Sequence, residues 1–161
     1  MNLYIMRHGE ATRRDGSNIG SANEKTLTDN GIEESECIAK MMLKNGCEPD
    51  VIVSSPIRRA VETATLMNNI FEDSGKVIVS EELRMGCDPH TLFSWLKAIF
   101  NQDILLVGHM PDVSNLTSFA LTGSFGLEVV FFTSTVCCIS FENGIRAGKG
   151  LLEWLIHPEL I

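Results

Sequence analysis

Short apolar runs alternate with helix-like segments through the first two thirds of the chain, and this alternation is the strongest constraint on the fold. The runs are residues 3–6, 51–53, 76–80 and 104–107. Strands that alternate with helices are typical of βαβ units, in which the strands lie parallel. The helices expected between and after the runs extend from a Thr28 cap to about Asn45, from Pro56 behind a Ser55 cap to about Phe71, from Pro89 past Ile99, and from Pro111 to about Leu121.

The last third of the chain has a different pattern. Residues 127–132, 136–141 and 150–156 are expected to form closely spaced strands, separated by turn residues such as Asn143-Gly144. Together, the two patterns predict an α/β fold of three αβα layers, whose mostly parallel central sheet has an antiparallel edge. A chain of 161 residues without a visible repeat or linker is expected to form a single domain over residues 1–161.

Composition narrows the range of partners. The net charge of −8, from 13 basic and 21 acidic residues, argues against a nucleic-acid-binding protein. No apolar run approaches the roughly 20 residues that a membrane span needs. The five cysteines include no Cys-x-x-Cys pair, which favours a reducing cytoplasm over a disulfide framework. No cluster of His, Cys and Asp has metal-ligand spacing, so we expect neither a metal nor another cofactor.

Polar side chains follow three of the predicted strands at their carboxyl ends. Arg7 and His8 follow the first run, Arg58 and Arg59 come one helical turn after the second, and His109 follows the fourth. In open α/β sheets, ligands bind at this edge. If these strands are neighbours, two imidazoles and at least two guanidinium groups meet in one pocket. Such a set suits phosphoryl transfer, because cations neutralise the phosphoryl oxygens and a neutral imidazole can attack phosphorus.

The chain resembles the histidine phosphatase (phosphoglycerate-mutase-like) superfamily in four motifs, which occur in that family's order over nearly the whole chain. The motifs are Met6-Arg7-His8-Gly9-Glu10, Leu27-Thr28 with Gly31, residues 54–64, and Val107-Gly108-His109. The short chain and the segment at residues 132–134 are most similar to the SixA-type phosphohistidine phosphatases within that superfamily.

The resemblance implies a role for each strand-end residue. His8 would be the nucleophile that becomes transiently phosphorylated, and His109 would contact the phosphoryl group and stabilise its transfer. Arg7, Arg59 and Gly9 would bind the phosphoryl oxygens. The positive charges of the two arginines also favour a neutral His8, which is the nucleophilic form. We expect Arg58, His90 and His157 to be surface residues.

One position departs from the family pattern and bears on the substrate. Relatives that cleave phosphate esters carry an acidic proton donor after the third strand, and this chain has Met85 there. An alkoxide leaves poorly without a proton, whereas phosphohistidine can leave as neutral imidazole, whose conjugate acid has a pKa of about 6.5. The departure therefore favours a protein phosphohistidine phosphatase. Glu82 and Asp88 are the candidate substitute acids.

The expected partner, by resemblance, is a phosphohistidine-bearing protein such as a phosphotransfer domain or a phosphocarrier, and the enzyme is expected to be a monomer. The short stretch between Arg59 and His109 has no room for an additional helical cap, so an open site is expected, with residues 11–25 as a partial lid. Two alternatives stay open. One is a small-molecule phosphomonoesterase or phosphomutase on the same scaffold, and the other is a phosphate-binding adaptor without turnover.

Overall fold

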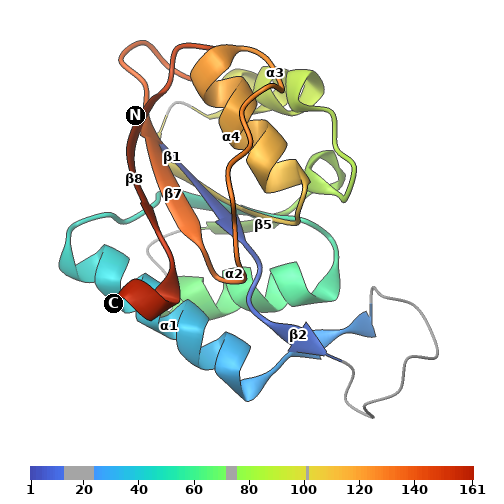
Figure 1. The fold of residues 1–161 in the computed structure, drawn as a ribbon, viewed down its shortest axis with the longest axis vertical. Coiled ribbons are helices and arrows are strands. Elements are labelled where there is room, and N and C mark those ends of the chain that lie inside the picture. Colours follow the sequence, from blue (N-terminus) through green and yellow to red (C-terminus); the bar gives the residue numbers. More distant parts are fainter. Residues whose placement is uncertain (13–23, 72–75, 101) are drawn as a thin grey trace.

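A computed structural model of the protein describes residues 1–12, 24–71, 76–100 and 102–161 (Figure 1). Its main sheet has six strands in the order β5-β4-β6-β1-β7-β8. The strands are β1 (Asn2–Arg7), β4 (Val51–Ser54), β5 (Lys76–Val79), β6 (Ile104–Gly108), β7 (Val136–Ser140) and β8 (Leu151–Ile156). The first four are mutually parallel, and β7 and β8 form the antiparallel edge, which confirms the predicted sheet. Of the expected loop at residues 11–25, residues 13–23 lie outside the described ranges.

Helices cover both faces of this sheet, so the three-layer prediction is also confirmed (Figure 1). α1 (Asp29–Lys44) and α2 (Arg58–Ile70) cover one face, and α3 (Pro89–Ile99) and α4 (Asp112–Thr122) cover the other. Because side chains alternate along a strand, Leu3 and Ile5 pack toward α3 and α4, whereas Tyr4 and Met6 pack toward α1 and α2. Within the described ranges, no helix is long and apolar enough to cross a membrane.

Of the four predicted helix starts, two are confirmed, one is wrong, and the start predicted at Pro111 lies one residue later, at Asp112. Thr28 caps α1 by accepting the N–H of Gly31, and Asp88 caps α3 with Pro89 in its first turn. The predicted start at Ser55 and Pro56 is wrong, because α2 begins at Arg58 and has no side-chain cap. The Ser55 hydroxyl instead accepts the N–H of Ile57 in the preceding turn, at 3.3 Å.

The predicted strand at residues 127–132 is wrong, because this segment forms no ladder with another strand. Its backbone is bonded to side chains instead. The N–H groups of Leu127 and Val129 donate to serine hydroxyls of α4, each at 3.0 Å. The apolar alternation persists without a ladder, since Phe131 is buried while Val130 and Phe132 are 64% and 59% exposed.

The first turn of α1 packs against the chain that follows β1. The N–H of Thr28 donates to the carbonyl of Glu10 at 3.0 Å. A Cβ atom added at Gly31 would collide with the Glu10 carbonyl oxygen and lie 2.7 Å from its amide nitrogen. A side chain at position 31 would therefore displace the loop that follows the strand-end residues Arg7 and His8. Two short strands, β2 (Ala11–Thr12) and β3 (Thr26–Leu27), pair beside this contact.

We predict that Gly31→Ala lowers the free energy of unfolding by about 1–3 kcal/mol, the usual cost of overpacking. Intrinsic helix propensity alone would favour alanine by about 1 kcal/mol, so the sign of the change tests the contact. Gly126→Ala is the control, because a Cβ at Gly126 meets no atom within 4 Å. Chemical denaturation measures both variants, and a stabilised Gly31→Ala protein would contradict the packing.

Candidate active site

The carboxyl ends of β1, β4 and β6 lie side by side at the centre of the sheet. Arg7 is in register with Gly108, and Ser54 is in register with Val107. The next residues continue the ladder, since the N–H of His8 donates to the Gly108 carbonyl at 3.0 Å. The expected convergence of strand-end side chains at one edge therefore occurs.

The guanidinium group of Arg59 lies between two imidazole rings. Its Nε donates to Nε2 of His8 at 2.9 Å, and its Nη2 lies 3.3 Å from Nδ1 of His109. The two ring centroids are 5.1 Å apart. All three side chains are at least nine-tenths buried. Because a guanidinium only donates, the ring nitrogen that faces it on each histidine presents a lone pair.

The remaining ring nitrogens have partners that complete the assignment of hydrogens. Nδ1 of His8 lies 2.7 Å from the carbonyl oxygen of Gly9, which only accepts, so Nδ1 carries the hydrogen. Nε2 of His109 lies 2.8 Å from the hydroxyl of Ser55. A neutral His109 therefore carries its hydrogen on Nε2. For His8, the atom available for attack on phosphorus is Nε2.

Both rings are held neutral by their surroundings. The pKa of His8 is lowered to about 4, mainly by burial; the hydrogen bond to Gly9 opposes this shift, and the positive charges of Arg59 and Arg7 add to it. Burial also lowers the pKa of His109 to about 3, with smaller contributions from His8 and the same arginines. The expected effect of the arginines on His8 has the right sign, but burial is the larger cause. At neutral pH the Nε2 lone pair of His8 is thus free of a proton.

Arg7 adds a second guanidinium to this edge. Its Nη1 donates to the carbonyl of Phe131 at 2.9 Å, which holds the group in place. Its Nε is buried and has no hydrogen-bond partner among the described residues. A buried unpaired donor is unfavourable by about 1–3 kcal/mol, and an oxyanion would satisfy it. With Arg59, it makes the site suited to a phosphoryl group.

Gly9 lies in the loop between β1 and β2, and it contacts α2. Its N–H donates to the hydroxyl of Thr63 at 3.0 Å, and that hydroxyl donates to the carbonyl of Arg59 at 2.8 Å. A Cβ at Gly9 would lie 2.7 Å from the hydroxyl oxygen of Ser35. The amide expected to bind phosphate is therefore engaged with Thr63. Sequence reasoning missed Thr63, whose position four residues after Arg59 places it on the same face of α2.

In the described part of the chain, neither candidate acid is hydrogen-bonded to His8 or His109. Asp88 caps α3, where its carboxylate accepts from the hydroxyl and the N–H of Thr91 at 2.7 and 3.0 Å. These hydrogen bonds lower the pKa of Asp88, and the bond from the Thr91 hydroxyl has the larger effect. Asp88 is therefore ionised at neutral pH. Glu82 lies in a short 3-10 turn, residues Glu81–Leu83, and is partly exposed. Met85 is 46% exposed in the following loop.

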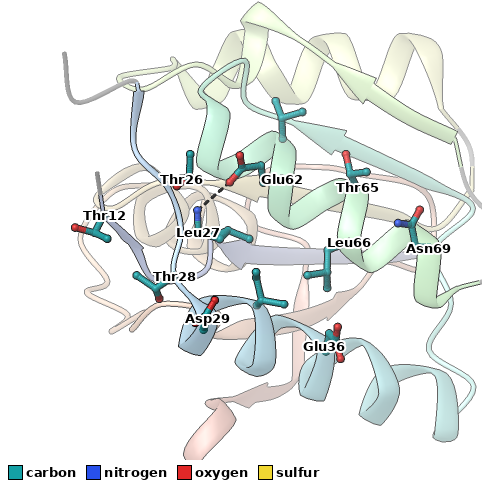
Figure 2. Close-up of a pocket in the computed structure, with 12 residues that line it drawn as sticks. Thr12, Thr26, Leu27, Thr28, Asp29, Glu36, Glu62, Thr65, Leu66 and Asn69 are labelled. Atoms are coloured by element: carbon teal, nitrogen blue, oxygen red, sulfur yellow. Dashed lines mark hydrogen bonds between the residues drawn. The ribbon is translucent and has the colours of Figure 1, made fainter. Parts of the chain in front are cut away.

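A hollow of about 870 Å³ lies between α1, α2 and β3 (Figure 2), and among the described residues neither Arg59 nor the two histidines line it. Figure 2 shows the Glu62 carboxylate accepting the N–H of Leu27, at 2.8 Å, on one wall. Asp29 and Glu36 line the other side. Three carboxylates disfavour an anion, so this hollow does not suit a phosphoryl group. Among the described residues, no group of three or more His, Cys, Asp or Glu side chains could hold a metal ion.

Comparisons with known proteins agree with this geometry. Residues 3–84 match the model of the histidine phosphatase superfamily (branch 1). The chain is 26% identical to the phosphohistidine phosphatase SixA of Escherichia coli (strain K12), over 98% of this chain and 94% of that protein. The solved structure of the protein histidine phosphatase SixA with tungstate is similar, with a TM-score of 0.84 and 25% identity over 99% of both chains. A phosphoserine phosphatase of Entamoeba histolytica shares the fold, with a TM-score of 0.66 and 18% identity over 96% of this chain and 95% of that one.

We predict that the protein loses stability as the pH falls from about 6.5 to about 4. In this window the unfolded chain protonates its histidines, whose pKa is about 6.5, while the folded chain keeps His8 neutral down to about pH 4. The difference for His8 corresponds to about 3 kcal/mol. Denaturant titrations at several pH values should therefore show a smaller pH dependence for His8→Asn than for the wild type. Parallel curves for the two proteins would contradict the burial of a neutral ring.

Proposed function

The chain belongs to the histidine phosphatase superfamily, and on that premise we propose that it is a protein phosphohistidine phosphatase acting through a phosphoenzyme on His8. The observation that carries the proposal is the neutral His8 ring, whose Nε2 lone pair faces the guanidinium of Arg59. This arrangement supports a nucleophile placed against an oxyanion site. Met85, at the position of the acid in ester-cleaving relatives, supports a substrate that leaves without a donated proton.

In the first step, the Nε2 lone pair of His8 attacks phosphorus. The P–N bond of the substrate breaks, and its electron pair goes to the departing ring nitrogen. Phosphohistidine that is protonated on its free nitrogen leaves as neutral imidazole, so the enzyme supplies no proton. Arg7 and Arg59 neutralise the phosphoryl oxygens, and the Gly9 carbonyl stabilises the positive ring through Nδ1–H.

In the second step, water attacks the phosphorus of phospho-His8. The bond between Nε2 and phosphorus breaks and returns the electron pair to Nε2. Nδ1 keeps its hydrogen, which remains hydrogen-bonded to the Gly9 carbonyl, so the ring is again neutral. Both protons of the water leave on the product, dihydrogen phosphate. The charges balance in each step without a metal or an acid–base residue.

A protein is the proposed carrier of the phosphohistidine. Val130 and Phe132 are largely exposed and flank Phe131, whose carbonyl holds Arg7. Exposed apolar side chains beside a cationic site fit the contact with a protein surface better than a sugar or glycerate phosphate. We propose a phosphotransfer domain or a phosphocarrier protein as substrate. That residues 1–161 form one domain, that the enzyme is a monomer and that it is cytoplasmic remain predictions.

The alternative is a phosphomonoesterase or phosphomutase for small molecules. The phosphoserine phosphatase of Entamoeba histolytica has the same fold, so the scaffold is compatible with this alternative. It would need a proton donor for the alkoxide. Asp88 would have to leave its hydrogen bonds with Thr91 to serve, and Glu82 would have to reach the leaving group from the 3-10 turn.

We predict that the enzyme hydrolyses a phosphohistidine protein at least about 100-fold faster than a panel of phosphomonoesters at matched concentration, because general acid catalysis contributes about that much to ester cleavage. His8→Ala should abolish phosphate release and labelling of the enzyme. His90→Ala is the control, since His90 is an exposed histidine on α3. Equal rates on esters would favour the alternative, and normal hydrolysis by His8→Ala would refute the proposed nucleophile. Binding of phosphate without any turnover would indicate an adaptor.

A further inference from the structure

The hydroxyl of Ser55 lies 2.8 Å from Nε2 of His109, on the side of the ring away from Arg59. Both side chains are almost completely buried, at 0% and 1% exposed. We propose that Ser55 is a positioning residue, which accepts the Nε2 hydrogen of His109 and holds the ring with Nδ1 toward the phosphoryl group. This inference rests on the proposed function only for the identity of that ligand.

The direction of the hydrogen bond follows from the other contacts. Nη2 of Arg59 lies 3.3 Å from Nδ1 of His109 and can only donate, so the hydrogen of the neutral ring is on Nε2. The Ser55 oxygen also receives the N–H of Ile57 at 3.3 Å. A hydroxyl oxygen has two lone pairs, and these two N–H groups use both of them. The ring orientation is thus determined from both sides.

When an oxyanion binds, Nδ1 of His109 has to donate a hydrogen bond rather than accept one. A lone pair at Nδ1 repels a phosphoryl oxygen, whereas a proton taken up there from solvent turns this atom into a donor. The resulting imidazolium donates Nδ1–H to the oxyanion and keeps Nε2–H on Ser55, so the ring does not turn. Nη2 of Arg59, which can no longer donate to Nδ1, then donates to the oxyanion as well. In the free enzyme, burial, His8 and the two arginines hold the ring neutral, with a pKa of about 3. Asp112, on the adjacent first turn of α4, is bonded to the N–H of Gly86 at 2.9 Å. The negative charge of the oxyanion favours the protonated ring.

The nitrogen protonation of His109 tests the proposal without turnover. NMR of the wild-type protein with ¹⁵N-labelled histidine should show a hydrogen on Nε2 alone in the free protein. With tungstate bound, both nitrogens of His109 should carry hydrogens. An unprotonated Nε2 in the tungstate complex would mean that Ser55 donates, and would overturn the proposal. A phosphatase assay on the same sample separates the two hypotheses, because absent phosphohistidine hydrolysis counts against the proposed function alone.

Ser55→Ala tests the consequence for catalysis. Loss of an acceptor for a charged donor should lower kcat/KM on a phosphohistidine protein by about tenfold or more. The loss should grow as pH rises, because an imidazolium without its acceptor gives up its proton at lower pH. Ser54→Ala is the matched control: that hydroxyl is also fully buried, but donates to the Ser55 carbonyl at 2.8 Å. A loss that is equal at every pH, or equal in both variants, would indicate a merely structural role and overturn the proposal.

Discussion

The rest of the site depends on one guanidinium that donates to two imidazoles. Arg59 determines which nitrogen of His8 and which of His109 carries a lone pair, because it can accept no hydrogen bond. Its own position depends on Thr63, which joins the Arg59 carbonyl to the loop after β1. The buried side chains of Arg59, His8 and His109 thereby connect the first turn of α2 with the carboxyl ends of β1 and β6.

Burial of these three side chains determines the protonation state of the two imidazoles. The central strands β1, β4 and β6 are apolar on both faces, and their carboxyl ends hold the histidines out of water. Exclusion of water favours the neutral imidazole, which is the form that can attack phosphorus. The same burial makes an unpaired donor unfavourable, as at Nε of Arg7, and so prepares the site for an anion. One physical cause thus supports both the proposed nucleophile and the proposed oxyanion site.

The sequence predicts the layers and the meeting of His8, Arg59 and His109, because strand and helix periods are local and parallel strands end at one edge. Prediction from the sequence is wrong where a polar group can form its hydrogen bond with more than one partner. The alternation at residues 127–132 is real, but hydroxyls of α4 and Arg7 bind that backbone in place of a strand. Ser55 has the chemistry of a helix cap, yet it lies against His109 and α2 starts later. The dominance of burial over the arginines in the pKa of His8 depends on tertiary packing, which no local pattern contains.

The position of the phosphoryl group on the phosphoenzyme is the most direct test of this account. The hydrogen bond from Nδ1 of His8 to the Gly9 carbonyl leaves Nε2 as the reactive atom. NMR of the enzyme labelled with ¹⁵N-histidine, trapped during turnover of a phosphohistidine protein, should show phosphorus bonded to Nε2 of His8. Phosphorus on Nδ1 of His8, or on His109, would contradict it.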